Sequence, residues 1–320
     1  MNTEIRNKIF LHSCESMDEI PTGSLRLIVT SPPYFNVKDY EIEGQIGKTE
    51  STYAEYLQRM VPVWQECFRV LKPNGKLVIN SPIMPMKKSE INTHHNRDIF
   101  NINNDIEQTI FEQTDFFLYG TVIWDKGSTD QLMMGSYPYP PNFYFLNTIE
   151  FINILVKDGK PEKIDKARKE ASRLSREEWR EYISTIWRFP PEKDRGHPAP
   201  YPLELPRRVI KLFSFVDDVI LDPFMGSGTT AVAALETGRH FVGYEINPEY
   251  VSMAEKRIRN YRADTRQVDI FREPIEETEY HSAEVVDRLK NLDDSDYDVI
   301  MQMLDEGYSI EEILFRSKTK

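Results

Sequence analysis

Long apolar runs, cysteines and histidines are scarce in this chain of 320 residues. No stretch of 18 or more apolar residues is present, which excludes a membrane-spanning helix. Its two cysteines, Cys14 and Cys67, are too few and too far apart for a disulfide framework or a zinc site. His94 and His95 have no cluster of ligand residues around them, so we expect no metal. Met1 to Arg6 lacks an apolar signal region, and we expect a cytoplasmic protein.

The formal net charge is −12, which is unusual for a chain that binds nucleic acid, but the charge is unevenly distributed. Residues 264–320 contain 16 Asp and Glu against 7 Lys and Arg, a balance of −9, which leaves −3 for residues 1–263. Between Lys157 and Lys211 the balance is +5, from 15 basic against 10 acidic residues. This segment is either a surface that faces phosphates or a solvated helix with paired charges.

Apolar strand patterns alternate with helical patterns along most of the chain, which predicts an α/β fold with a mostly parallel sheet. Strands are expected at 25–30, 76–80, 219–221 and 240–244, and helices at 53–71, 229–237 and 247–261. Residues 116–124 and 148–156 are expected to form a hairpin pair across a long loop. The Asn-rich segment 81–115 is interpreted as a loop, and the acidic tail after Asp264 as a small helical appendage.

A glycine-rich turn, Asp222 to Thr230, follows the apolar strand 219–221. Glycine lets a ligand approach the backbone closely, and the free N–H groups of the following helix favour an anionic group. Glu245 ends the next strand, 23 residues after Asp222, where an acid can accept the hydroxyls of a ribose. The turn alone also fits a nicotinamide dinucleotide, so it does not decide between cofactors.

A second turn, Thr30-Ser31-Pro32-Pro33-Tyr34, follows the apolar run 25–29. Ser31 Oγ and the Pro32 carbonyl can accept both N–H bonds of an exocyclic amine, Pro33 makes the turn rigid, and Tyr34 can stack on a flat ring. These features predict a pocket for the amino group of cytosine or adenine. A base inside a duplex can reach such a pocket only if it is flipped out of the helix. We consider the aromatic residues Phe35 and Tyr40 and residues 137–144 as walls of the pocket.

With both turns in view, residues 5–260 resemble the amino-directed DNA methyltransferases of bacterial restriction-modification systems. In their β arrangement the catalytic motif precedes the cofactor motif, as Ser31 to Tyr34 precedes Asp222 to Thr230 here. Asp222-Pro223-Phe224 resembles the S-adenosyl-L-methionine turn of that family. The similarity includes Gln45-Ile46-Gly47, residues 71–75, residues 123–126, residues 197–206 and residues 243–247.

The resemblance implies a Rossmann-like methyltransferase that uses S-adenosyl-L-methionine and no metal, with a mostly parallel sheet of seven strands. The catalytic residues would be Ser31, Pro32, Pro33 and Tyr34. One departure concerns the end of a short strand expected at residues 5–11, where His12-Ser13 stands in place of the Gly-Asp that the family often has. The cofactor residues would be His12, Ser13, His197, Pro198, Ala199, Asp222, Pro223, Phe224, Gly226, Ser227, Gly228, Thr229, Glu245, Ile246 and Asn247.

On this basis we expect four parts along the chain. Residues 1–156 would form the catalytic half and residues 196–263 the cofactor half of the methyltransferase domain. Residues 157–195 would form a helical segment that recognises DNA, and residues 264–320 the acidic tail. The resemblance does not extend into the tail.

The resemblance implies site-specific methylation of double-stranded DNA, and Ser31 at the head of the motif favours N4 of cytosine over N6 of adenine. A cytosine-C5 enzyme needs a nucleophilic cysteine, usually after proline, and neither Cys14 nor Cys67 is in such a setting. A nicotinamide oxidoreductase and a catalytically silent DNA-binding regulator stay open as alternatives of other classes. The sequence does not decide the recognition site, the presence of a cognate restriction endonuclease, or whether the protein is a monomer or a homodimer.

Overall fold

The computed structural model describes residues 3–35, 44–50, 52–87, 97–127, 138–139, 145, 147–192 and 201–271. The chain divides into two compact units, Met1–Ala263 and Asp264–Lys320. The first unit carries every strand described below. The helices expected in the acidic tail beyond Phe271 lie outside the described residues.

An eight-stranded sheet forms the centre of the first unit, with the order β1-β10-β9-β2-β3-β7-β6-β8. In this sheet only β7 is antiparallel to its neighbours, β3 and β6, which confirms the prediction of a mostly parallel sheet. The antiparallel pairing of β6 with β7 also confirms the predicted hairpin pair. The eighth strand is the short β8, which pairs in parallel with the end of β6. In sheet order the strands are β1 (Lys8–Phe10), β10 (His240–Tyr244), β9 (Val219–Asp222), β2 (Leu25–Thr30), β3 (Leu71–Ser81), β7 (Ile149–Lys157), β6 (Phe116–Asp125) and β8 (Ile186–Arg188).

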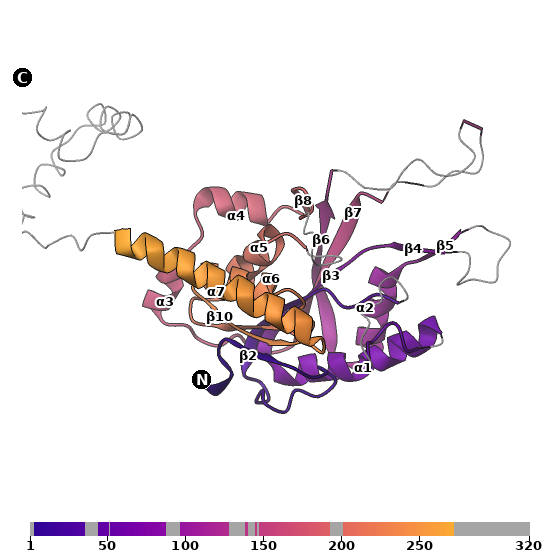
Figure 1. The fold of residues 1–320 in the computed structure, drawn as a ribbon, viewed down its shortest axis with the longest axis horizontal. Coiled ribbons are helices and arrows are strands. Elements are labelled where there is room, and N and C mark those ends of the chain that lie inside the picture. Colours follow the sequence, from indigo (N-terminus) through magenta and orange to yellow (C-terminus); the bar gives the residue numbers. More distant parts are fainter. Residues whose placement is uncertain are drawn as a thin grey trace, which may run out of the picture. The chain divides into compact units, whose positions relative to one another are not determined.

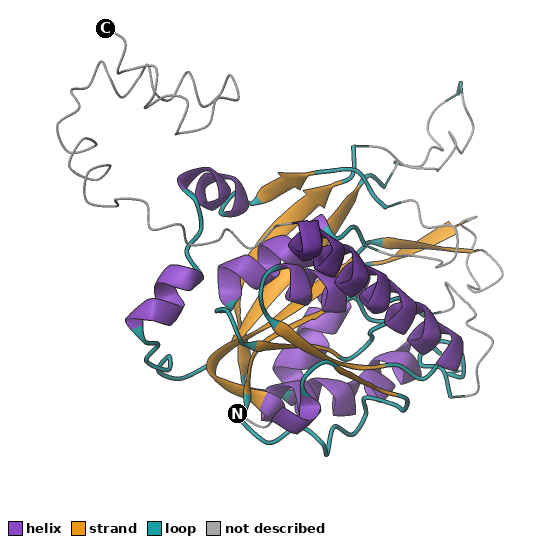
Figure 2. Cartoon of the chain, turned by 60° about the vertical axis from the view of Figure 1, so that its left-hand side comes forward, coloured by secondary structure: helices purple, strands orange, loops and turns teal. Residues whose placement is uncertain are grey.

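Helices cover both faces of this sheet (Figures 1 and 2). Helices α1 (Tyr53–Val70) and α2 (Ile102–Gln113) pack on one face, and α5 (Glu204–Phe213), α6 (Thr229–Glu236) and α7 (Pro248–Phe271) pack on the other. Successive strand residues alternate between the two cores: Ile28 faces α1, whereas Leu27 and Val29 face α5 and α6. Burial on both faces explains why β2 reads as a continuous apolar run.

Two helices begin with the same side-chain arrangement. In α1 the hydroxyl of Thr52 accepts from the Glu55 N–H, and the Glu55 carboxylate accepts from the Thr52 N–H. Ser175 and Glu178 make the equivalent pair before α4 (Arg176–Tyr182), as their spacing in the sequence predicts. Two other short helices are described, a 3-10 helix η1 (Thr3–Ile5) and α3 (Lys166–Ala171).

The interpretation of residues 81–115 as a loop is wrong. Helix α2 occupies Ile102–Gln113, and β4 (Met84–Lys87) pairs with β5 (Arg97–Phe100) in a separate two-stranded sheet. Ile102, Ile106 and Ile110 are fully buried at helical spacing, and Asn101 caps the first turn. Three of the asparagines that suggested a loop, Asn101, Asn103 and Asn104, therefore begin a helix, because asparagine is a strong N-cap residue.

Candidate functional site

The two turns singled out in the sequence begin side by side. Strands β2 and β9 are neighbours in the sheet and run parallel, with Ile28 opposite Leu221. Their carboxyl ends therefore meet at the same edge, where α/β sheets bind ligands. The Thr30 hydroxyl donates to Asp222 Oδ1 at 2.8 Å, which ties the two strand ends together.

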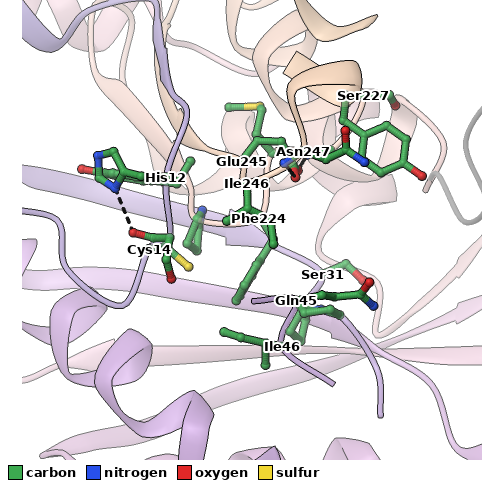
Figure 3. A pocket seen from close by; sticks show the side chains of 18 of the residues that line it. His12, Cys14, Ser31, Gln45, Ile46, Phe224, Ser227, Glu245, Ile246 and Asn247 are labelled. Atoms are coloured by element: carbon green, nitrogen blue, oxygen red, sulfur yellow. Dashed lines mark hydrogen bonds between the residues drawn. The ribbon is translucent and has the colours of Figure 1, made fainter. Parts of the chain in front are cut away.

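A cavity opens between these turns at the carboxyl edge of the sheet. Figure 3 shows Glu245, Ile246 and Asn247 on one side of it, Ser31, Gln45 and Ile46 on the other, and Phe224 between them. Predicted site residues from four separate segments meet here. Those on the cavity wall are His12, Ser13, Ser31, Pro32, Pro33, Tyr34, Pro223, Phe224, Gly226, Ser227, Thr229, Glu245, Ile246 and Asn247.

The Ser-Pro-Pro-Tyr turn is held by contacts on both sides. Ser31 Oγ and Tyr34 OH are 2.7 Å apart and hydrogen bonded, and Tyr34 OH also donates to the Asn80 carbonyl at 3.3 Å. From α1, the Tyr56 hydroxyl donates to the Pro33 carbonyl at 2.9 Å. Gly47 has a φ of +87°, and a Cβ there would lie 3.0 Å from the Tyr34 carbonyl oxygen. The turn is thus positioned before any substrate arrives.

Glu245 presents an oriented carboxylate to the cavity. Its Oε2 accepts from the Gly226 N–H and its Oε1 from the Asn247 N–H, both at 2.9 Å. Burial raises the pKa of Glu245 above its ordinary value, although these backbone hydrogen bonds oppose the shift. Each oxygen keeps a second lone pair that can accept a ribose hydroxyl. With the exposed backbone at Gly226 and the apolar Phe224 and Ile246, this donor set fits the nucleoside part of S-adenosyl-L-methionine.

Among the predicted cofactor residues that the structure describes, two do not line the cavity. Gly228, with a φ of +82°, packs against α7, and a Cβ there would lie 2.9 Å from the Cβ of Ala254. Asp222 is only 1% exposed and lies beneath the cavity. Its carboxylate accepts from the hydroxyls of Thr30, Thr230 and Tyr201 and from the Phe224 N–H. Asp222 therefore joins the catalytic strand to the cofactor turn.

His12 takes part in a polar network at the wall of the cavity. Its Nδ1 donates to the Ser13 carbonyl at 3.0 Å, and its Nε2 lies 2.8 Å from Glu19 Oε1. The Tyr244 hydroxyl donates to the other oxygen of Glu19 at 3.0 Å. Although partial burial opposes the charge, the bonds to Ser13 and Glu19 raise the pKa of His12. His12 and Ser13 thus lie on the cavity wall, at the position where the family that the sequence resembles often has Gly-Asp.

Several other residues that were predicted to line the site either lie away from the cavity or lie outside the described residues. Phe35 is not a wall of the cavity, because it is 6% exposed and packs against Tyr53 and Tyr56. Tyr40, most of residues 137–144, and His197, Pro198 and Ala199 lie outside the described residues. Several residues of the cavity wall were not predicted, although five of them, Gln45, Ile46, Tyr201, Met225 and Tyr244, lie within motifs noted in the sequence. The missed residues are Cys14, Gly44, Gln45, Ile46, Tyr201, Met225, Tyr244 and Tyr250.

Neither cysteine is available as a nucleophile. Cys14 lies on the cavity wall but is only 3% exposed, and Cys67 is fully buried. Burial raises the pKa of both thiols above the ordinary value, which disfavours the thiolate that a nucleophile needs. Within the part of the chain that the structure describes, no group of three His, Cys, Asp or Glu side chains could hold a metal ion. No helix in that part is long and apolar enough to cross a membrane.

A cavity at the carboxyl edge of a mostly parallel sheet, with the Glu245 carboxylate on one side and the Ser-Pro-Pro-Tyr turn on the other, is the arrangement expected of an S-adenosyl-L-methionine-dependent methyltransferase. A model of the DNA methylase family that acts at N6 and N4 matches residues 25–256. The chain belongs to this N6/N4 DNA methylase family, and it is an S-adenosyl-L-methionine-dependent DNA methyltransferase.

Known relatives agree with this family. The type II methyltransferase M.MjaI of Methanocaldococcus jannaschii is 32% identical over 287 residues, which cover 79% of this chain and 91% of that protein. The type II methyltransferase M.BglI of Bacillus subtilis is 31% identical, covering 76% and 82% of the two chains. A protein of Thermus thermophilus, assigned as a DNA modification methylase and crystallised with S-adenosyl-L-methionine, is 31% identical with a TM-score of 0.64. That match covers 79% of this chain and 95% of the other.

We expect Glu245→Gln to weaken S-adenosyl-L-methionine binding about 10- to 100-fold, because hydrogen bonds to a charged acceptor contribute about 1.5–3 kcal/mol. Glutamine also has only one acceptor oxygen for the two backbone N–H groups that orient Glu245. Isothermal titration calorimetry with the cofactor measures the effect. Glu255→Gln is the matched control, because Glu255 is exposed on α7 and does not line the cavity. Equal affinity of the two variants would refute this role of Glu245.

Proposed function

We propose that the protein transfers a methyl group from S-adenosyl-L-methionine to the exocyclic N4 of a flipped-out cytosine in double-stranded DNA. The observation that carries the proposal is the position of Ser31. Its hydroxyl lies on the wall of the same cavity as Glu245 and Phe224, directly after the strand that pairs with the cofactor strand. The choice of cytosine over adenine rests on serine at the head of the Pro-Pro-Tyr motif.

The exocyclic amine of cytosine is a poor nucleophile because its lone pair is delocalised into the ring. When bound, S-adenosyl-L-methionine supplies a methyl group on a positively charged sulfur. Ser31 Oγ and the Pro32 carbonyl accept the two N–H bonds of the amine, which draws the nitrogen toward tetrahedral geometry and orients its lone pair. The proton that the amine loses passes to solvent, because the neutral Ser31 hydroxyl is too weak a base to hold it.

Tyr34 serves as the stacking surface for the extruded base. Its ring lines the cavity, and its hydroxyl is held by Ser31 and the Asn80 carbonyl. Asn80 Nδ2 in turn donates to Glu150 at 2.6 Å, and Glu150 pairs with Lys126 at 3.0 Å. This chain of contacts connects the motif residue Lys126 to the catalytic turn. We assign Asn80, Glu150 and Lys126 as positioning residues.

The proposed DNA-recognition segment, residues 157–195, reaches the active edge of the sheet through β8. This strand pairs with the last three residues of β6, Ile123 to Asp125. Arg188 ends β8, is largely exposed, and lies 3.4 Å from Asp125. An exposed guanidinium at this edge suits a DNA phosphate or a guanine edge, and we propose Arg188 as a DNA contact.

The decisive experiment identifies the methylated nucleoside. The purified protein is incubated with plasmid DNA and methyl-labelled S-adenosyl-L-methionine, the DNA is digested, and the nucleosides are analysed by mass spectrometry. We expect labelled N4-methylcytosine, and we expect Ser31→Ala to abolish it. Detection of N6-methyladenine would show that the target base is adenine and not cytosine. Cofactor binding without any labelled nucleoside would identify a silent DNA-binding regulator.

A further inference from the structure

A second cavity lies at the opposite, amino-terminal edge of the sheet. Its walls come from Arg26 near the start of β2, from Lys76 of β3, which lies opposite Leu27, from Tyr119 of β6, two strands further along the sheet, and from α3 and α4. Arg26 precedes Ser31 by five residues of extended chain, which places the two edges roughly 16 Å apart. This cavity is therefore separate from the cofactor and target cavity.

The second cavity is lined by cations. Glu162 is the one acid on its described wall, and it pairs with Arg26 at 3.0 Å and with Lys72 at 2.7 Å. Other acids near the cavity are also engaged: Glu178 binds Lys211, and Asp218 binds Arg26 and Arg168. The basic residues on the wall are Arg26, Lys76, Lys169, Arg173, Arg176 and Lys211.

Three of these cations, Lys76, Lys169 and Arg176, have no carboxylate partner among the described residues. Elsewhere in the basic segment 157–211, pairing is common, as with Arg207 and Glu204 at 2.7 Å. Other cations of this segment also have no carboxylate partner among the described residues, but they do not line the cavity: Lys157, Lys160, Lys163, Lys166 and Arg180. What distinguishes the second cavity is that three unpaired cations meet on its wall.

Among the three unpaired cations, Lys76 is a buried residue, with only 8% of its surface exposed. Its ammonium donates to two oxygens of Asn74, the carbonyl at 2.7 Å and Oδ1 at 2.9 Å, and both acceptors are neutral. Burial, with a smaller effect from nearby Arg26, lowers the pKa of Lys76. A buried cation without a counter-ion is costly, and an anion in the cavity would offset that cost.

We propose that this second cavity binds a phosphate group, with Lys76 at its base and Lys169 and Arg176 at its rim. A phosphate group offers several strong acceptor oxygens, and a phosphate monoester also carries more negative charge than a carboxylate, which suits a set of unpaired cations. Tyr119 and Trp179, 61% and 55% exposed, flank the cavity and can cover the group that bears the phosphate. The phosphate can come from a small phosphorylated compound or from the backbone of DNA.

Isothermal titration calorimetry with inorganic pyrophosphate tests the proposal on the full chain. Saturating S-adenosyl-L-methionine is present so that the first cavity does not contribute. We expect Lys76→Met to weaken pyrophosphate binding at least about 10-fold, and Lys169→Met, at the exposed rim, about 3- to 10-fold. Lys163→Met is the matched control, since it removes one charge from the same segment but does not line the cavity.

Absence of pyrophosphate binding to the wild type would overturn the proposal, as would equal affinities for the Lys169→Met variant and the Lys163→Met control. Lys169→Met keeps the test valid if Lys76→Met does not fold, because Lys169 is exposed. A short DNA duplex added as competitor identifies the source of the phosphate. Displacement of pyrophosphate by the duplex indicates the DNA backbone, and retention indicates a small phosphorylated compound; both outcomes support a phosphate site.

Discussion

Tyr34→Ala is expected to lower kcat/KM for DNA methylation by about 100-fold, the upper part of the range for loss of one base-stacking contact of about 1–3 kcal/mol. The variant loses the ring that lines the cavity and also the hydroxyl that holds Ser31 Oγ at 2.7 Å. Binding of S-adenosyl-L-methionine should change less than about threefold, because the contacts of Glu245 and Gly226 remain. Steady-state methylation assays and cofactor calorimetry on the same preparation separate the two effects.

Tyr34→Phe distinguishes the ring from the hydroxyl. This variant keeps the stacking surface and loses only the hydrogen bonds to Ser31 and to the Asn80 carbonyl. We expect a decrease of about 10-fold in kcat/KM, in line with the loss of about 1 kcal/mol for each of one or two hydrogen bonds. Wild-type turnover by Tyr34→Ala would show that the target base does not stack on this residue.

Asp222→Asn is expected to reduce the free energy of unfolding by about 2–4 kcal/mol, because charged hydrogen bonds contribute about 1.5–3 kcal/mol each. The Asp222 carboxylate is the common acceptor for Thr30, Thr230, Tyr201 and the Phe224 N–H. An asparagine has one acceptor oxygen in place of two and presents an N–H₂ group to hydroxyls that donate in the wild type. Urea unfolding followed by circular dichroism measures the loss.

Asp217→Asn provides the control for Asp222→Asn. Asp217 is five residues earlier, has a 69% exposed side chain, and has a φ of +65°, a conformation that asparagine tolerates. The same substitution there should change stability by less than about 0.5 kcal/mol. If both variants unfold at the same urea concentration, the hydrogen bonds of Asp222 do not stabilise the junction between the two turns.

Elements with a strong local pattern could be predicted from the sequence. The limits predicted for β2 match the observed ones because its apolar run ends at a Pro-Pro turn, and those of β10 match because an apolar run lies between two charged segments. Helix α2 was missed because only three isoleucines and one threonine of its twelve residues are buried. A narrow apolar stripe among asparagines gives a weak periodic signal, and contacts with α1 stabilise the helix in the folded chain.

The candidate site was predictable where a motif contributes backbone or side chains directly to the cavity, as at Ser31, Phe224 and Glu245. Its lateral walls depend on long-range packing that no local pattern encodes. Tyr201 reaches the site because its hydroxyl bonds to Asp222, 21 residues away, and Met225 does so because Gly243 leaves room for its side chain. The same packing explains why Asp222 does not contact the ligand as the motif suggests: the fold buries its side chain beneath the cavity.

Strands β2 and β9 are paired in the sheet but are far apart in the sequence, so the ribosome synthesises them at different times. Thr30 and Asp222 are 192 positions apart. At a synthesis rate of about 5–20 residues per second, the ribosome completes β9 roughly 10 to 40 s after β2. During that interval one edge of a strand that is buried along its whole length in the folded chain lacks its final partner. The nascent chain should therefore depend on chaperones until its cofactor half emerges, and slower synthesis of that half should increase aggregation.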